Sequence, residues 1–156
     1  EAGEEVLSAA AMKIKKHYPE ITVSVRAPQE LLMIPMDVIL IEQVLINLME
    51  NAVQHGKTTT RIELRLSSAG GLAVFEVADN GCGIEKELLP HLFEGYLTRD
   101  QEEISDQRRN MGIGLSVCMS IVQAHGGTMR AENRKKGGAL LQFSLPLEEN
   151  SHEHQR

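Results

Sequence analysis

The sequence predicts an α+β fold, a two-layer sandwich in which about three helices cover one face of a mixed, mostly antiparallel sheet. Segments with helical spacing of apolar residues alternate along the chain with pairs of segments that alternate apolar and polar residues. The order is helix, two strands, helix, two strands, polar loop, helix, two strands. The length of 156 residues suits one domain, expected over residues 1–147, with a frayed charged tail at 148–156.

The first half of the chain contains two of the expected helices. Residues 4–18 carry an apolar stripe that Pro19 ends, and residues 21–26 alternate as a strand. The apolar run 31–34 is a candidate edge strand, because Pro35 follows it. Asp37 is the expected N-cap of a helix that continues to residue 55, where Gly56 ends it.

The second half supplies most of the expected sheet. Residues 60–66 and 72–79 alternate as strands, and so do 128–134 and 139–145, which form a terminal hairpin. We expect a short helix at 85–89 and an amphipathic helix at 114–124. The stretch from 94 to 111 is almost entirely polar, so we expect a functional loop that is mobile without ligand to about residue 110.

Composition excludes several classes of protein. The net charge of −6 argues against a general nucleic-acid or anionic-membrane surface. The two cysteines lack metal-site spacing, which favours a reduced, cytosolic protein. No run of about 18 apolar residues is present. The chain starts without Met inside a helical pattern, so we expect a piece of a longer protein.

A carboxylate followed by two glycines marks the end of the strand at 72–79. Asp79 is held by the sheet, and Gly81 and Gly83 let a ligand approach the backbone. A carboxylate can accept a hydrogen bond from an exocyclic amine such as that of adenine. The alternative is that Asp79 caps the short helix that follows.

Two other segments have the chemistry of a phosphate site. Asn47 and Asn51 share one face of a helix, and an amide oxygen is a suitable ligand for Mg²⁺. Gly112 and Gly114 open the helix at 114–124, where backbone N–H groups and the helix dipole favour phosphate. Taken singly, each segment also has a purely structural explanation. The two asparagines could be solvent-facing amides, and the two glycines could be small residues at a helix N-cap.

Two familiar phosphate-binding fingerprints are incomplete. The segment 56–58 (GKT) ends like a Walker A motif, but Asn51 stands where its first glycine is required. The second glycine pair lacks the third glycine of a dinucleotide fingerprint, because residue 117 is Val.

Together, in order, the motifs resemble the N, G1, F and G2 boxes of sensor histidine kinases. They are the segments 47–52 (NLMENA), 79–83 (DNGCG), 92–94 (LFE) and 112–115 (GIGL). The resemblance covers nearly the whole chain and implies the Bergerat ATP-binding fold. The runs 41–47 (IEQVLIN) and 125–127 (HGG) are similar to the Kdp-type potassium sensor kinases.

The resemblance implies a role for each matching residue. Asn51 would ligate the Mg²⁺ that bridges the ATP phosphates, and Asp79 would bond the adenine amine. Phe93 would anchor the loop over the nucleotide, and Asn47 stands where related ATPases carry a Glu that activates water. The implied ATP-binding set is Asn47, Asn51, Gln54, His55, Asp79, Gly81, Gly83, Ile84, Phe93, Gly112, Ile113, Gly114 and Leu115, with Arg108 and Arg109 as candidates to meet the γ-phosphate.

Three positions depart from the family pattern. Gln54 stands where the family usually has Lys, His55 where it has an aromatic residue, and Asn110 where the second glycine box begins with Gly. The missing Lys removes a cation from the phosphates, so either Lys57 or the Arg108–Arg109 pair substitutes for it, or ATP binds more weakly.

The resemblance also implies partners outside this chain. These are a dimerisation and phosphoacceptor domain, a response regulator and a membrane-anchored homodimeric sensor of which this would be a cytoplasmic part. Of the six histidines only His152 is followed by Glu, and it lies in the tail, so we expect the acceptor His upstream of Glu1. The alternatives are an ATPase or serine kinase on the same fold, and a nucleotide-sensing or partner-binding module with degenerate chemistry.

Overall fold

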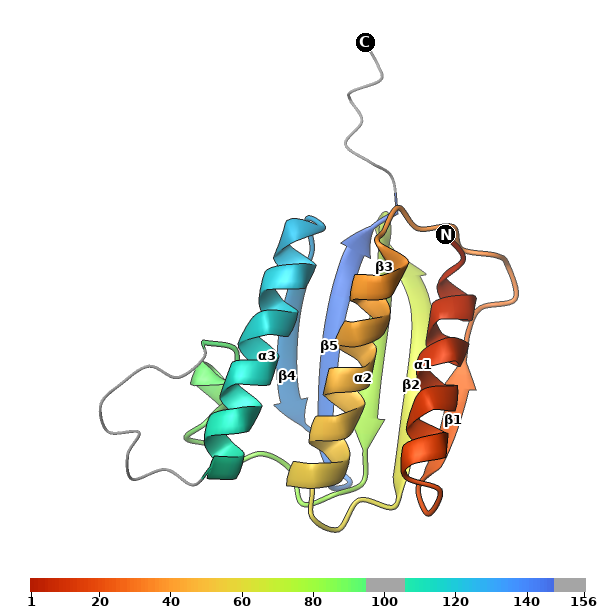
Figure 1. The fold of residues 1–156 in the computed structure, drawn as a ribbon. Coiled ribbons are helices and arrows are strands. Elements are labelled where there is room, and N and C mark those ends of the chain that lie inside the picture. The colour runs from red at the N-terminus through yellow and green to blue at the C-terminus, as the bar shows by residue number, and fades with distance from the viewer. Residues whose placement is uncertain (95–105, 148–156) are drawn as a thin grey trace.

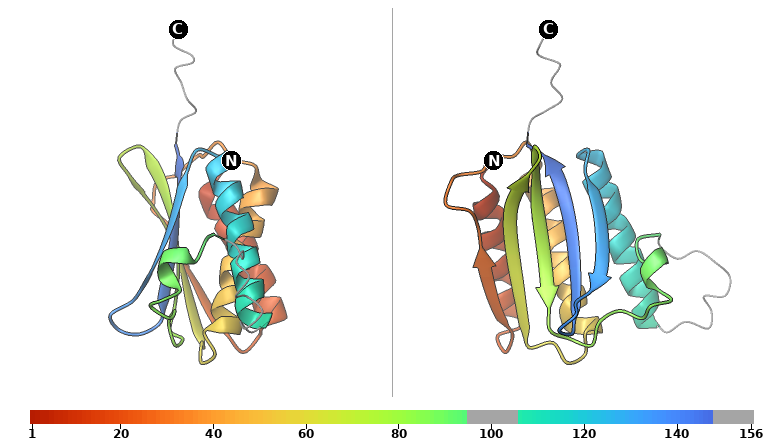
Figure 2. Two further views of the ribbon diagram at one scale, coloured as in Figure 1. Left: turned by 90° about the vertical axis from the view of Figure 1, so that its left-hand side faces the viewer. Right: turned by 180° about the vertical axis from the view of Figure 1, so that it is seen from behind.

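The computed structural model describes residues 1–94 and 106–147, and within 106–113 it describes the backbone alone. One sheet has the strand order β1-β2-β3-β5-β4, and α1, α2 and α3 lie against one of its faces (Figures 1 and 2). This confirms the predicted α+β sandwich. The elements are α1 (Gly3–His17), β1 (Thr22–Arg26), α2 (Val38–His55), β2 (Arg61–Ala69), β3 (Leu72–Asp79), the 3₁₀ turn η1 (Leu89–His91), α3 (Asp106–Ala124), β4 (Thr128–Asn133) and β5 (Ala139–Pro146).

The strand pairing follows from the connections. β1 and β2 are parallel, because the chain crosses between them through α2. The other pairs are antiparallel, and β5 lies between β3 and β4. At the centre of the sheet Phe75 faces Phe143, and their stacked rings have centroids 4.7 Å apart.

The core is aliphatic apart from this ring pair, and α2 is its central helix. α2 lies between α1 and α3 (Figure 1), and its stripe of Ile41, Leu45 and Leu48 is fully buried. Burying a side chain of this size contributes roughly 1.5–3 kcal/mol. α2 is therefore held on three sides, by two helices and by the sheet beneath it.

The helices leave one face of the sheet open (Figure 2, right). Polar side chains connect the strands across that face. Ion pairs and side-chain hydrogen bonds run between neighbouring strands, which is the expected solvated face of a one-sided sheet. In order from β1 to β4 the linked residues are Arg26, Glu63, Arg65, Glu76, Gln142 and Arg130.

The N-terminus of α2 is capped as predicted and also bonded to the end of α3. Asp37 Oδ1 accepts a hydrogen bond from Leu40 N–H at 3.1 Å. Asp37 N–H donates to His125 Nε2 at 3.0 Å, so Nδ1 of this ring carries the proton and donates to Ile121 O at 2.9 Å. The cap therefore joins the two helices that flank the nucleotide motifs.

The expected edge strand at 31–34 is wrong. Only Met33 forms an isolated bridge, and it pairs with Ala2. Leu32 O accepts from Gly3 N–H, and Ile34 N–H donates to Glu1 O. The polar groups of this segment are thus satisfied by the start of α1 and not by the sheet.

Two helix boundaries differ from the prediction. Residues 85–88 form a turn followed by η1, because Pro90 has no N–H with which to continue an α-helix. α3 begins at Asp106, so Gly112 and Gly114 lie inside it and do not open it. Gly56 does end α2, but in a right-handed conformation (φ −75°), and the left-handed residue is Lys57 (φ 60°).

Within residues 1–94 and 106–147, none of the helices combines the length and the apolar character needed to cross a lipid bilayer.

Replacing the N-cap should lower stability in a way that depends on the hydrogen-bond acceptor. We expect Asp37→Ala to lower the free energy of unfolding by about 1 kcal/mol, because Leu40 N–H loses its partner. Asp37→Asn keeps an acceptor and should cost much less. Urea denaturation followed by circular dichroism measures both, and equal losses would contradict the capping role.

Candidate functional site

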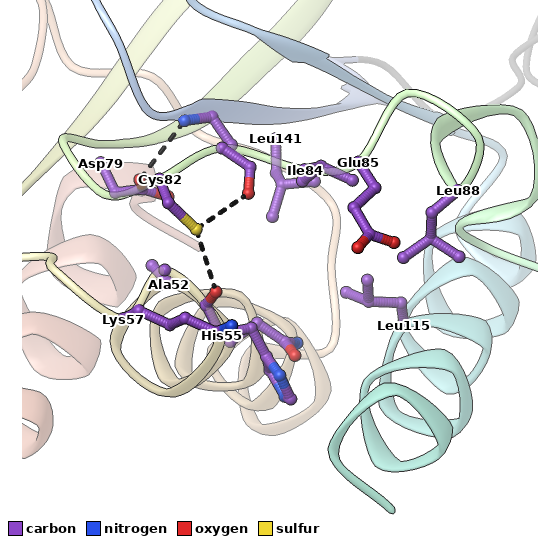
Figure 3. Close-up of a pocket in the computed structure, with 14 residues that line it drawn as sticks. Ala52, His55, Lys57, Asp79, Cys82, Ile84, Glu85, Leu88, Leu115 and Leu141 are labelled. Carbon is purple, nitrogen blue, oxygen red and sulfur yellow. Dashed lines mark hydrogen bonds between the residues drawn. The ribbon is translucent and has the colours of Figure 1, made fainter. Parts of the chain in front are cut away.

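A cavity of about 190 Å³ lies between the C-terminal half of α2 and the loop that follows β3 (Figure 3). One wall is the end of α2, the opposite wall is the loop at 79–85, and the start of β5 closes the back. Its lining residues are Asn51, Ala52, His55, Gly56, Lys57, Asp79, Cys82, Gly83, Ile84, Glu85, Leu88, Leu115, Ala139 and Leu141.

Asp79 is the buried acid of this cavity. The core-facing residues of β3 alternate as Ala73, Phe75 and Val77, and Asp79 is next in this series, so its carboxylate enters the helix-covered side of the sheet with only 4% of the residue exposed. Asp79 Oδ1 accepts hydrogen bonds from Gly81 N–H at 2.8 Å and Ala139 N–H at 3.3 Å. This fixes the carboxylate between the loop and β5.

The electrostatics of Asp79 are those of a buried, partly satisfied acid. Burial raises the pKa of the carboxyl above its ordinary value. The bonds from Gly81 and Ala139, and the charge of Arg134, act on this pKa in the opposite direction. In the part of the chain that the structure describes, no hydrogen bond reaches Oδ2. That oxygen is available to a donor on a ligand.

Two glycines allow the loop to fold back against α2. A Cβ on Gly81 would overlap Thr59 Oγ1 and lie 2.8 Å from Gly56 O. Gly83 has φ +85°, a conformation that side chains other than glycine rarely adopt. Cys82 N–H donates to Gly56 O at 2.9 Å and completes the contact between the loop and the helix end.

The α2 residues of the predicted site divide between the cavity and its surroundings. Asn51 lines the cavity; its Nδ2 donates to Asn47 O at 2.9 Å, and Oδ1 has no hydrogen bond within the described residues. Asn47 lies outside the lining: its Oδ1 accepts from Gln43 at 3.0 Å and its Nδ2 donates to Cys118 Sγ at 3.7 Å. Gln54 also lies outside the lining, and its Nε2 donates to the Tyr18 hydroxyl at 3.2 Å.

His55 lines the cavity, at the end of α2. Burial lowers the pKa of its imidazole, and the positive charge of Lys57 lowers it further. At neutral pH this ring is therefore uncharged. It contributes a flat, weakly polar surface to the cavity wall and no positive charge.

The structure describes the second glycine box only in part. Leu115 is buried and lines the cavity. The side chains of Arg108, Arg109 and Ile113 lie outside the described residues, and Gly112 is placed only as part of α3. Phe93 is half-buried and packs against the core beside Leu92. The loop expected to be mobile falls mainly on residues 95–105, which are also outside the description.

Several residues around the cavity were missed by the sequence reasoning. Thr59 is buried and donates to Ala52 O at 2.7 Å, and Asn80 Oδ1 accepts from Thr60 and Arg61 N–H. Asn133 and Arg134 bond the loop after β3 from the β4–β5 turn. No spacing rule distinguishes these polar residues from ordinary turn residues, because their partners are distant in sequence.

The donor set suits Mg²⁺ bound through phosphate better than a metal held by protein alone. Among the described residues no three His, Cys, Asp or Glu side chains come together as a metal site. The amide oxygen of Asn51, to which none of the described residues bonds, is the kind of single hard ligand that Mg²⁺ accepts beside water and phosphate oxygens.

The family comparison agrees with this geometry. The model for histidine kinase-, DNA gyrase B- and HSP90-like ATPases matches residues 36–149. The chain is 40% identical to the sensor protein KdpD of Clostridium acetobutylicum over 93% of its length, and 32% identical to KdpD of Escherichia coli over 92%. It spans only 16% of each of these relatives.

Solved structures show the same fold. The ATP binding domain of PrrB from Mycobacterium tuberculosis superposes with a TM-score of 0.76 at 27% identity and covers 94% of each chain. Full-length ShkA in complex with AMPPNP gives 0.72 at 26% identity, covering 92% of this chain and 29% of that one. The chain therefore belongs to the histidine kinase-, DNA gyrase B- and HSP90-like ATPase family and, within it, to the catalytic ATP-binding domains of sensor histidine kinases.

Proposed function

We propose that this domain binds ATP with Mg²⁺ and transfers the γ-phosphoryl group to a histidine on a dimerisation domain elsewhere in the full-length protein. The observation that carries the proposal is the buried Asp79 carboxylate at the wall of a cavity large enough for a base. It is fixed through Oδ1 and, among the described residues, unbonded at Oδ2. The exocyclic amine of adenine is the donor that this oxygen fits.

The base would lie between apolar walls. Ile84, Leu88 and Leu141 line the cavity around Asp79 and exclude water from the pair. A base without the amine would leave the buried carboxylate unsatisfied, which is a strong basis for discrimination. His55 would pack beside the base as an uncharged ring in place of the aromatic residue usual in the family.

The phosphate end would lie toward Asn51 and the first turns of α3. Asn51 Oδ1 would hold Mg²⁺, which neutralises phosphate charge and orients the transferred group. Because α3 begins at Asp106, the N–H groups that have no partner within the helix lie in the turn that carries Arg108 and Arg109. These arginines, and Lys57 at the cavity, are the cations proposed to replace the missing Lys at position 54.

Phosphoryl transfer is favoured over ATP hydrolysis by the chemistry of Asn47. An amide cannot act as a general base, and both ends of this amide are already bonded, to Gln43 and to Cys118. The degenerate nucleotide-sensing module remains the second candidate, supported by Gln54, whose bond to Tyr18 holds it off the cavity. Normal Mg-ATP binding without transfer to the cognate acceptor domain would favour that second candidate.

The partners follow from the same proposal. The domain would act on the dimerisation domain of a homodimeric, membrane-anchored bacterial sensor and, through it, on a response regulator. The histidine kinase ThkA, solved in complex with the response regulator protein TrrA, shares this fold at 24% identity.

Removing the Asp79 charge should weaken ATP binding. We expect Asp79→Asn to raise the dissociation constant for Mg-ATP by about 10- to 100-fold, because a buried donor that loses its acceptor costs about 1–3 kcal/mol. Glu76→Gln is the matched control, since it removes a carboxylate from the same strand on the open face. Calorimetry at millimolar Mg-ATP measures both, and unchanged binding by Asp79→Asn would refute the adenine assignment.

Removing the Asn51 amide should affect the metal-dependent part of binding. We expect Asn51→Ala to reduce ATP affinity about tenfold when Mg²⁺ is present and to leave binding in EDTA unchanged, because only the metal ligand is lost. Gln54→Ala is the control on the same helix, expected within about twofold of wild type, because Gln54 bonds Tyr18 outside the cavity. Equal losses with and without metal would contradict the ligand role of Asn51.

The alkylation rates of the two cysteine thiols should show whether nucleotide occupies the cavity. Cys82 is exposed and lines the cavity, whereas burial raises the pKa of the Cys118 thiol to about 11 and keeps it protonated and unreactive. Iodoacetamide should therefore alkylate Cys82 first, and Mg-ATP should slow that reaction. Mass spectrometry of the labelled chain measures the rates, and fast labelling of Cys118 in the folded domain would contradict the description.

A further inference from the structure

The turn between β4 and β5 lies across the loop that follows β3, and the last residue of β4, just before this turn, clamps that loop. Asn133 Oδ1 accepts a hydrogen bond from Ile84 N–H at 2.7 Å, and Asn133 Nδ2 donates to Ile84 O at 2.8 Å. One side chain thus satisfies both backbone groups of a residue that lines the cavity. Gly83 makes room for this clamp, because a Cβ there would lie 2.9 Å from Asn133 Oδ1.

The next residue holds the other end of the same loop. Arg134 Nη1 donates to the backbone oxygen of Asp79 at 2.7 Å, a charge-assisted bond. The turn itself is closed by Arg134 N–H to Gly138 O at 2.8 Å. A Cβ on Gly138 would overlap Asp79 O, so the turn approaches the acid at backbone distance.

Neither Asn133 nor Arg134 lines the cavity. Their bonds end instead on the two residues that define its base-recognising wall, Asp79 and Ile84. Without these bonds, the first part of the loop is still held by the contacts of Asp79 Oδ1, by the bonds of the Asn80 side chain to Thr60 and Arg61, and by Cys82 N–H at the end of α2. The position of Ile84 in particular depends on Asn133.

We propose that Asn133 and Arg134 are positioning residues for the nucleotide, which set selectivity for the adenine amine by fixing Asp79 and Ile84 from the β4–β5 turn. The inference rests on the proposed function of the cavity. A purely structural role for the pair, holding the hairpin to the sheet, would change binding of every nucleotide alike. A positioning role changes the discrimination between a base with the amine and a base without it.

The test compares ATP with inosine 5′-triphosphate, which carries an oxygen in place of the amine, each titrated with Mg²⁺ into the chain by calorimetry. We expect wild type to prefer ATP, and Asn133→Ala to weaken ATP binding about tenfold, the equivalent of one lost hydrogen bond. Its binding of the inosine nucleotide should stay within about twofold, so the ratio of the two affinities falls. Arg134→Gln should change the ratio in the same direction.

Lys135→Gln is the matched control. Lys135 is exposed in the same turn, and its replacement removes the same charge as Arg134→Gln without touching the loop. We expect it to leave the ratio unchanged. Melting temperatures of all variants distinguish loss of fold from loss of selectivity. If Asn133→Ala does not fold, the conclusion is drawn from Arg134→Gln.

Three results would overturn the inference. Equal weakening of both nucleotides in Asn133→Ala and Arg134→Gln would leave the pair a structural role only. Unchanged affinities in both variants would remove any role. A fall in the ratio with Lys135→Gln as large as with Arg134→Gln would assign the effect to charge. Failure of wild type to bind Mg-ATP at all is a different result, which overturns the proposed function itself.

Discussion

The burial of one carboxylate organises the site. β3 alternates core-facing apolar residues, and Asp79 occupies the last core-facing position, where an unpaired charge is costly. Its oxygen is satisfied by N–H groups from the loop at 81 and from the start of β5 at 139, so these two segments must meet there. Gly138 is a consequence of that meeting, because a Cβ there would overlap Asp79 O, whereas Gly81 is required by the contact of the loop with Thr59 and Gly56 at the end of α2.

The two ends of the site are held in different ways. The base end is built from the sheet, the end of α2 and the β4–β5 turn, which are joined by hydrogen bonds between segments far apart in sequence. The proposed phosphate end depends on two helices: Asn51 on α2, and the first turns of α3. The bond from Asp37 N–H to His125 joins the start of α2 to the end of α3, away from the cavity. This bond fixes the position of the two helices relative to each other.

The family includes proteins with different chemistries on one fold, so the fold alone does not select phosphoryl transfer. The residue at position 47 is a better indication of whether phosphoryl transfer or hydrolysis is favoured. A carboxylate there could activate water, whereas the amide of Asn47 is bonded at both ends and sits beside the buried Cys118 thiol. In the proposed function, the absence of a base at this position leaves positioning and charge neutralisation as the means of catalysis.

The sequence alone determined the α+β sandwich, the cap at Asp37 and the strand that ends at Asp79, and its motif order predicted that Asn51 and Asp79, which line one cavity, lie together. Periodicity and motif order are local properties that the chain carries without folding. Only the tertiary structure decided that 31–34 pairs with the start of α1, that α3 begins before its glycines and that Gln54 bonds Tyr18. It alone revealed Asn133 and Arg134, whose partners lie 49 and 55 residues away. Such bonds depend on strand order and register, which place β5 beside β3 and which no short stretch of sequence specifies.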